Sequence, residues 1–351
     1  MTGPNTYNLQ CPIPKSDYEH ILLAHGGGGK LTQQLIEKMF YTGLGNELLE
    51  VGHDGALLPP IKGNLAFTTD SFVVDPIFFP GGDIGDLAIN GTVNDLVCCG
   101  AKPLYISLAF ILEEGFLLEE LWKVVQSIGN AALTAGVKIV TGDTKVVERG
   151  HGDKIFINTS GIGVIPEAVH IDPSTAKDGD LVIINGSIGD HGVAVMSARE
   201  GLEFESPITS DTAALNGLVD HIFKITNKIS VLRDPTRGGV ATTLCEISDS
   251  AGTGIVLEEK SLPVSAEVRG VCEILGLDPL YIANEGKILI IVPRPFAEDV
   301  LAAMKQHPLG RDSAIIGRIT NEHPGVVRMI TSIGSSRVID MLSAEQLPRI
   351  C

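Results

Sequence analysis

The sequence predicts a mixed α/β protein, with α+β character, built as two domains. Its 351 residues exceed what one hydrophobic core usually organises. Strand-like apolar runs alternate with helical patterns in both halves. Pro166 and the polar stretch 170–179 interrupt this alternation near the middle. We therefore expect a flexible leader at 1–20, domains at 21–165 and 166–320, and a closing segment at 321–351 that holds final strands and a mobile tail.

The strand and helix patterns define each half in order. In the first half they predict strands at 65–74, 105–112, 137–140 and 155–165, and helices at 31–40, 84–99 and 118–135. In the second half they predict strands at 180–185, 254–257, 288–292, 314–319 and 326–331, and helices near 211–226, 238–250, 264–275 and 296–306. A glycine-rich turn at 186–192 leads into a further helix.

Composition argues against several classes of protein. Hydrophobic residues make up 44% and charged residues 20% of the chain, which is typical of a globular protein. A net charge of −17 argues against nucleic acids and anionic membranes as partners. We find neither a signal-peptide pattern in residues 1–20 nor an apolar run long enough to span a membrane. The six cysteines show no CxxC or Cys/His ligand spacing, so we expect a reduced, cytoplasmic protein.

A glycine loop opens the first domain. Gly26, Gly27, Gly28 and Gly29 precede Lys30 and a helical pattern. Bare N–H groups at the start of a helix can wrap a phosphate, although the sequence is not a Walker A motif. A plain flexible hinge is the alternative.

Asp95 is the most informative acidic residue of the first half. The apolar stripe of helix 84–99 includes Leu87, Gly91 and Cys98, and Asp95 falls on that stripe. An unpaired buried carboxylate is costly, so we expect Asp95 to be paired or to bind a metal. A structural aspartate satisfied by backbone donors is the alternative.

Four other acidic residues each lie in a turn or at a strand, beside glycine-rich segments. They are Asp54, Asp70, Asp143 and Asp234. Together with Asp95 they are what a nucleotide site with several Mg²⁺ ions needs, although any one of them could be a solvated turn residue. Asp143 and Lys145 follow the strand at 137–140, where α/β sheets usually bind ligands.

The chain ends on a cysteine, Cys351. The residues from Met341 onward could span roughly 30–35 Å if extended, enough to reach a cleft. Two interpretations stay open from the residues alone: a frayed end with an accidental cysteine, or an arm whose thiol carries a small group.

Several motifs together resemble one known family. They are AHGGGG (24–29), TTDSFVVDP (68–76), TGDTKVV (141–147), RDPTRGGV (233–240), ANEGK (283–287) and the terminal PRIC (348–351). The chain resembles the HypE family, the carbamoyl dehydratases of nickel–iron hydrogenase maturation. That family lies within a wider group with aminoimidazole ribonucleotide and selenophosphate synthetases. The likeness covers 21–351, and the terminal motif is its most specific part.

The resemblance implies a PurM-like fold and a homodimer. The N-terminal halves would pair into a barrel-like core, with α/β layers outside and ATP and Mg²⁺ between the halves. By motif position, the Mg·ATP acids would be Asp54, Asp70, Asp95, Asp143 and Asp234. Lys145 would face phosphate oxygens, and the loop Gly26–Gly29 would close over the nucleotide. Pro235 departs from the alanine expected there and removes one backbone donor.

The resemblance also assigns a chemistry to the tail. A HypF-type carbamoyltransferase would carbamoylate Cys351, and ATP would phosphorylate the amide oxygen so that it leaves as phosphate. Glu285 is our candidate base, and Arg349 could lower the pKa of the thiol or be a plain surface arginine. The resulting thiocyanate would supply cyanide through a HypC–HypD-type iron scaffold. The alternatives are a small-molecule phosphotransferase of the selenophosphate or aminoimidazole ribonucleotide synthetase type, and a non-catalytic thiol carrier.

Overall fold

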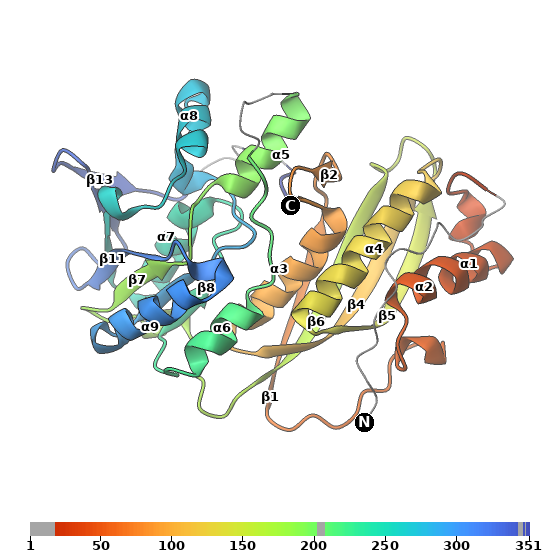
Figure 1. Cartoon of the computed structure of the whole chain (residues 1–351), viewed down its shortest axis with the longest axis horizontal. Coiled ribbons are helices and arrows are strands. Elements are labelled where there is room, and N and C mark those ends of the chain that lie inside the picture. Colours follow the sequence, from red (N-terminus) through yellow and green to blue (C-terminus); the bar gives the residue numbers. More distant parts are fainter. Residues whose placement is uncertain (1–17, 202–207, 343–346, 348) are drawn as a thin grey trace.

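The computed structural model describes residues 18–201, 208–342, 347 and 349–351. They form two sheet-based units that lie side by side (Figure 1). Most of the expected leader, including Cys11, lies outside the described residues. Among the helices that the structure describes, we find none with the length and apolar character needed to cross a membrane.

The N-terminal unit is built on a four-stranded sheet. Its strands lie in the order β1 (Asn64–Phe72), β6 (Ile155–Ile165), β4 (Lys102–Glu113) and β5 (Lys138–Val147). Only the β4–β5 pair is parallel. Helices α3 (Ile84–Cys98) and α4 (Leu118–Ala135) cover one face (Figure 1). Smaller elements precede β1 and α3: α1 (Lys30–Leu35), a π-helical turn (Ile36–Phe40), α2 (Tyr41–Leu44), β2 (Phe78–Phe79) and β3 (Gly82–Asp83).

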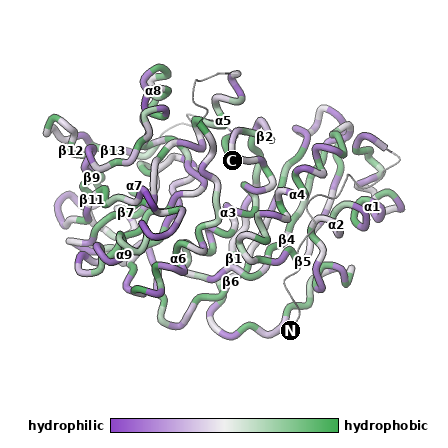
Figure 2. Tube along the Cα trace, in the orientation of Figure 1, coloured by the Kyte–Doolittle hydropathy of each residue, from purple (hydrophilic) through white to green (hydrophobic). Residues whose placement is uncertain are grey.

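Asp83 is the N-cap of helix α3. The Asp83 carboxylate accepts hydrogen bonds from the N–H groups of Gly85 and Asp86, at 2.6 and 3.3 Å. Most of α3 is buried, because it packs on the sheet on one side and on the second unit on the other. Gly91 permits the approach to the sheet: a Cβ there would lie 2.9 Å from the Phe72 ring. By contrast α4 is amphipathic, and Figure 2 shows hydrophobic and hydrophilic residues alternating along it.

The other face of this sheet lacks a helical cover. Side chains alternate along each strand, so alternate residues point away from α3 and α4. On that face Leu65, Phe67 and Ile111 are 56, 68 and 45% exposed. Three large hydrophobic side chains on one open sheet face are typical of a surface that another protein covers.

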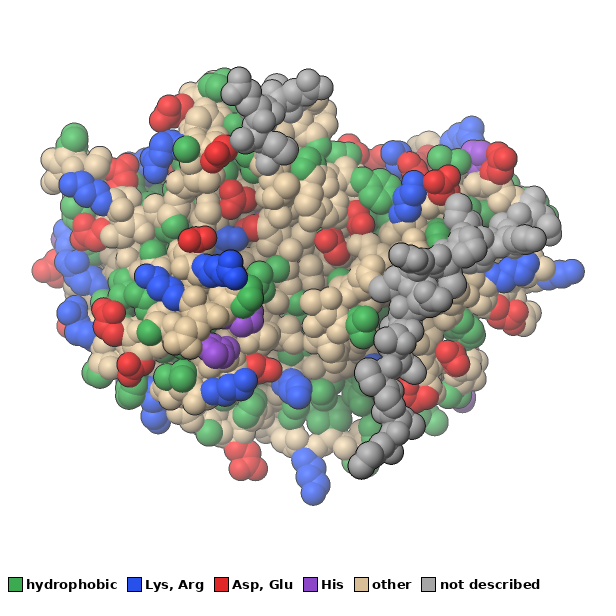
Figure 3. Space-filling model, viewed as in Figure 1, with side chains coloured by type: hydrophobic (Ala, Val, Ile, Leu, Met, Phe, Trp, Pro, Cys, Tyr) green, Lys and Arg blue, Asp and Glu red, His purple; other side chains and the backbone are tan. Residues whose placement is uncertain are grey.

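The C-terminal unit contains a seven-stranded sheet. Its order is β13 (Ser336–Ile339), β12 (Val327–Ile330), β9 (Gly254–Glu258), β11 (Ala314–Thr320), β7 (Leu181–Ile184), β10 (Leu289–Val292) and β8 (Val231–Arg233). The helices of this unit are α5 (Asp190–Glu200), α6 (Asn216–Phe223), α7 (Gly239–Ala251), α8 (Ala266–Leu275) and α9 (Arg294–Gln306). On the face seen in Figure 3, acidic and basic side chains are interspersed.

Asn94 of α3 joins the two units. Its side-chain amide donates to the carbonyl oxygens of Ala213 and Glu285, both at 3.0 Å, and its oxygen accepts from the Leu215 N–H at 2.9 Å. One hydrophobic cluster also runs from the α3 region into the β7 and β10 strands of the second unit. These contacts fix the position of α3 near Asn94 relative to the segment that bears Glu285.

The structure differs from the sequence predictions mainly at element ends. Strand β5 continues to Val147 rather than ending at 140, so Asp143 and Lys145 lie within it. The strand is longer because β5 pairs in parallel with β4 as far as Val147. Since β5 is an edge strand, polar side chains can lie within it. Helix α6 begins at Asn216 rather than 211, because 210–215 forms an irregular segment against α3. Strands β8 and β13 were not expected.

Candidate active site

Four carboxylates from separate parts of the chain influence one another at the junction of the two units. They are Asp70 in β1, Asp95 in α3, Asp234 after β8 and Glu285 before β10. Three of them were predicted as Mg·ATP acids and the fourth as the base. The structure therefore brings together residues more than two hundred positions apart.

Burial and mutual repulsion raise the pKa values of this acidic cluster. Burial raises the pKa of Asp70 and of Asp95. Burial, and then the charge of Asp95, raises the pKa of Asp234 to about 6. Burial raises the pKa of Glu285 well above its ordinary value, and the neighbouring carboxylates add to the effect. Acids that repel one another in this way favour a bound cation.

Asp95 and Asp234 are each fixed by a side-chain donor. The Thr68 hydroxyl donates to Oδ2 of Asp95 at 2.7 Å, and the Cys98 thiol donates to Oδ1 of Asp234 at 3.5 Å. Asp95 is half-buried on α3, close to what its position on the apolar stripe predicts. Its donor is a hydroxyl from β1, whereas the structural alternative expected backbone groups. The Arg233 guanidinium opposes the rise in the pKa of both acids.

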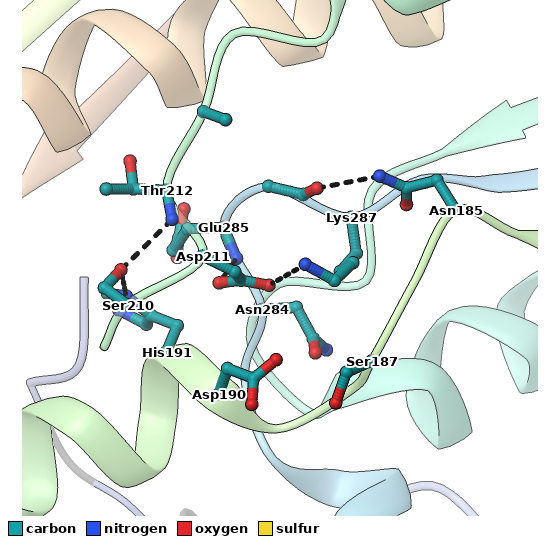
Figure 4. A network of polar contacts seen from close by, with 12 residues as sticks. Asn185, Ser187, Asp190, His191, Ser210, Asp211, Thr212, Asn284, Glu285 and Lys287 are labelled. Atoms are coloured by element: carbon teal, nitrogen blue, oxygen red, sulfur yellow. Dashed lines mark hydrogen bonds and ion pairs between the residues drawn. The ribbon is translucent and has the colours of Figure 1, made fainter. Parts of the chain in front are cut away.

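The loop that bears Glu285 is held rigidly by its neighbours. Asn284 donates to the carbonyl oxygen of Pro235 at 2.9 Å and accepts from the Gly189 N–H at 2.8 Å. Asn185 donates to the carbonyl oxygen of Gly286 at 3.0 Å. These bonds leave the Glu285 side chain as the projecting group of a fixed turn (Figure 4).

Asp211 and Lys287 support Glu285 from behind. One Asp211 oxygen accepts from the Glu285 N–H at 3.1 Å, and the other lies 2.9 Å from Nζ of Lys287 in a buried ion pair. Oε1 of Glu285 is buried and has no hydrogen-bond partner among the described residues. Sequence reasoning missed both supporting residues. Lys287 lies in the ANEGK motif, whereas Asp211 lies in an irregular segment with no periodic signal.

The glycine loop lines a second region of the N-terminal unit. A pocket of about 310 Å³ lies between this loop, the first helices and β5. The Gly28 N–H donates to the Thr32 hydroxyl at 3.0 Å. A Cβ at Gly26 would lie 2.5 Å from the Val146 backbone nitrogen, so the loop can pack on β5 only with glycine there.

Asp143, Lys145 and Asp54 belong to this second region. Nζ of Lys145 lies 2.6 Å from both oxygens of Asp143, and this hydrogen bond lowers the pKa of Asp143. Asp143 and Lys145 both line the pocket. Asp54 is exposed on the loop before β1, and its neighbours His53 and Gly55 line the same pocket.

The two groups of acids lie on opposite faces of one sheet. Asp70 is in register with Thr159, which contacts α3 through the Thr92 hydroxyl. Asp143 is in register with Ala109, and Ala109 with Asn158, the residue before Thr159. Since successive residues alternate, Asp143 points to the helix-free face. Accordingly, within the described parts of the chain no three His, Cys, Asp or Glu side chains are arranged to hold a metal ion.

The C-terminal tail lies against the end of β1. The Val73 N–H donates to the carbonyl oxygen of Cys351 at 3.2 Å, and the Asp75 N–H donates to that of Arg349 at 3.3 Å. Ile350 is 3% exposed, and Cys351 is half-buried against the hydrophobic cluster that joins the two units. Figure 1 shows the C-terminus beside β2 and α5, at the junction between the units.

Two sheet-based units around an acidic junction define the class of protein. The first unit matches the family model described as AIR synthase related protein, N-terminal domain, over residues 52–165, and the second matches the C-terminal domain of that description over 177–330. The two-domain PurM-like fold implied by the resemblance is thereby confirmed.

The chain belongs to the HypE family of carbamoyl dehydratases. It is 51% identical to the carbamoyl dehydratase HypE of Cupriavidus necator over 353 residues, which cover 100% of both chains. The crystal structure of a hydrogenase maturation protein HypE in complex with ATP matches with a TM-score of 0.91 and 48% identity, covering 94% of this chain and 99% of that one. A chain in the crystal structure of a HypE–HypF complex matches with a TM-score of 0.78 and 52% identity, covering 88% of this chain and 99% of that one.

Proposed function

We propose that this ATP-dependent carbamoyl dehydratase acts on its own C-terminus, converting a carbamoyl group on the Cys351 sulfur into a thiocyanate. The observation that supports this most directly is the tail itself. It lies along the end of β1, three residues beyond Asp70 of the acidic cluster. The arrangement favours an enzyme over a thiol carrier, because a carrier has no use for buried, mutually repelling acids in the protein on which its tail docks.

The reaction needs ATP because an amide oxygen is a very poor leaving group. The carboxamide oxygen attacks the γ-phosphorus, the bond to ADP breaks, and the nitrogen loses one proton. The resulting O-phosphorylated imidate loses its second N–H proton as the C–O bond breaks. The products are S–C≡N, phosphate and ADP, so the amide oxygen leaves within phosphate.

The acidic cluster fits a divalent cation. Asp70, Asp95 and Asp234 offer oxygen ligands, and burial raises the pKa of each of them, so a bound cation would offset the cost of their charge. Among the described residues no three of these side chains surround a single point, so binding would need them to move together. We assign these three residues to Mg²⁺ at the junction. Asp54 and Asp143 belong to the separate pocket region on the opposite face of the sheet, and we assign them to the phosphate-binding groups there. Bound Mg²⁺ supplies charge neutralisation for the phosphates. When the nucleotide binds, Lys145 leaves its contact with Asp143 and faces phosphate oxygens instead. The glycine loop then covers the nucleotide.

Glu285 is the group that takes the N–H protons. Its turn is fixed, its carboxyl is buried, and one oxygen lacks a hydrogen-bond partner among the described residues. A raised pKa makes its carboxylate a stronger base than an ordinary glutamate once it is ionised.

Oxygen tracing tests this chemistry directly. If the carboxamide oxygen of S-carbamoylated Cys351 carries ¹⁸O, the phosphate released with Mg·ATP should contain that ¹⁸O, as measured by mass spectrometry of the phosphate. Unlabelled protein in ¹⁸O-water is the control, and its phosphate should stay unlabelled. Label appearing from water, and none from the carboxamide, would disprove O-phosphorylation.

The helix-free sheet face is the surface through which two copies pair into the homodimer. It is apolar, and Asp143 and Lys145 lie on the same face, so pairing there brings phosphate-binding groups to the subunit boundary. We expect Phe67→Asp to convert a dimer into a monomer, because a charge in an apolar interface is left without a partner. Light scattering after size exclusion measures the mass.

Ile274→Asp is the matched control for the dimer, since Ile274 of α8 is 80% exposed and lies on the other unit. This variant should keep the mass of the wild type. A wild-type chain of monomeric mass, or a dimeric Phe67→Asp variant, would exclude this interface.

The chemistry implies two protein partners. A HypF-type carbamoyltransferase supplies the carbamoyl group, and a HypC–HypD-type iron scaffold receives cyanide from the thiocyanate. A thiol that must stay reduced to accept the group suits the cytoplasm.

A further inference from the structure

The docked tail is held mainly through its backbone carbonyl oxygens. Two bonds come from the N–H groups of Val73 and Asp75, in the manner of a short β-bridge. The remaining bonds to the carbonyls of Arg349 and Ile350 come from side chains of α5 in the second unit. Helix α5 therefore contributes to the same groove as the end of β1.

Arg199 bridges the tail and the segment that follows β1. Its Nε and one terminal nitrogen donate to the carbonyl oxygen of Asp75, at 2.8 and 2.5 Å. The same terminal nitrogen donates to the carbonyl oxygen of Arg349 at 2.7 Å. A guanidinium offers several donors in one rigid plane, so it can fix the separation of two backbones.

His191 binds the backbone carbonyl of Ile350, the residue after Arg349. It is fully buried, and its Nε2 lies 2.9 Å from the carbonyl oxygen of Ile350. Its Nδ1 lies 2.8 Å from the Ser210 hydroxyl, which itself accepts from the Thr212 N–H at 3.1 Å (Figure 4). Ser210 is therefore free to donate to Nδ1, which leaves the proton on Nε2 to be donated to the tail. Burial lowers the pKa of His191, which favours this neutral form.

The docked tail is also poised for release. Arg349 adopts a left-handed backbone, with φ of 53°, which is unfavourable for a residue other than glycine. Its side chain offsets this by pairing with Asp153 and donating to the carbonyl oxygen of Val73 at 3.0 Å. A strained residue held by polar contacts suits an arm that must also leave the groove.

We infer that Arg199 and His191 are positioning residues that hold the carbonyl groups of Arg349 and Ile350 and thereby set the place of the Cys351 thiol for dehydration. The inference rests on the proposed function for its catalytic consequence, but the docking itself does not. Because both residues bind backbone groups, they fix the register of the tail more than its side-chain identity. They act through the backbone of the tail.

Accessibility of Cys351 tests docking without any catalysis. Iodoacetamide alkylation of the full-length protein, followed by mass spectrometry of the C-terminal peptide, gives its rate of modification. Arg199→Ala and His191→Leu should each raise that rate about tenfold, the order expected for loss of one charged or buried hydrogen bond. Glu200→Ala, one residue along α5 and exposed, is the matched control and should leave the rate unchanged.

Conservative variants separate positioning from folding. His191→Gln keeps an N–H donor near the position of Nε2 and should restore slow alkylation, whereas His191→Leu fills similar space without a donor. Equal alkylation rates in the wild type, Arg199→Ala and His191→Leu would overturn the inference.

Single-turnover dehydration tests the catalytic consequence. With S-carbamoylated protein and Mg·ATP, the rate of water loss should fall in Arg199→Ala by about the factor by which alkylation rises. The ATP concentration for half-maximal rate should stay the same, because Arg199 and His191 bind the tail and are not assigned to the nucleotide. An unchanged water-loss rate would overturn the positioning role. If the wild-type protein loses no water, the proposed function fails. The alkylation rates still decide whether Arg199 and His191 hold the tail in its groove.

Discussion

Replacing Cys351 with alanine is expected to abolish ATP-dependent loss of water from the C-terminal peptide. In the wild type, the peptide that ends in S-carbamoylated Cys351 should lose the mass of one water when Mg·ATP is added. Alanine has no sulfur to carry the carbamoyl group, so the substrate itself is absent. The loss should therefore be complete, and mass spectrometry of the terminal peptide measures it.

The control for this experiment is another cysteine. Cys99 is exposed at the end of α3 and contributes no ligand or base to the proposed reaction. Cys99→Ala should carbamoylate and dehydrate at Cys351 as the wild type does. Water loss that persists in Cys351→Ala, or that maps to the Cys99 peptide, would show that the tail is not the substrate.

Much of the local structure could be predicted because it depends on neighbours in sequence. The N-cap at Asp83, helix α4 and strand β6 follow from capping, periodicity and β-propensity within one short segment. The end of β5 could not be predicted in the same way. Its extension through Asp143 depends on pairing with β4, which lies more than thirty residues earlier.

The sequence predicted which residues belong to the candidate site better than it predicted how they are arranged. Motif resemblance identified Asp70, Asp95, Asp234 and Glu285, and the structure places them at one junction. It does not place Asp143 with them, since a residue's face of the sheet depends on register. Residue spacing marked neither Arg199 nor His191 as a site residue, because the groups that they bind are backbone carbonyls some 150 residues away.

Substituting Glu285 with glutamine is expected to lower the single-turnover rate of water loss by about a thousandfold, while the protein becomes more stable. Loss of a general base typically costs between about a hundredfold and ten-thousandfold. Glutamine has nearly the same shape, and it removes a charge that four neighbouring carboxylates oppose. The free energy of unfolding at neutral pH should therefore rise, because burial and the neighbouring carboxylates raise the pKa of Glu285 only in the folded state.

The pH dependence has a definite sign. The pKa of Glu285 is raised in the folded protein, so between the ordinary value of 4.5 and the raised value the folded state binds more protons than the unfolded state. The wild type therefore loses stability as pH rises through that window, and Glu285→Gln should not share this loss. The stability difference should vanish below about pH 4, where Glu285 is protonated in both states. The wild-type water-loss rate should instead increase with pH through the raised pKa, as the base ionises.

Thermal unfolding across this pH range, together with the water-loss rate, distinguishes a base from a structural acid. Glu298→Gln, at an exposed position on α9, should change neither quantity. A structural acid would behave in the opposite way: the glutamine variant would unfold at lower temperature and keep most of its rate. A base held in a fixed turn against like charges stabilises the transition state at the expense of the fold, so only a catalytic Glu285 makes the inactive variant the more stable one.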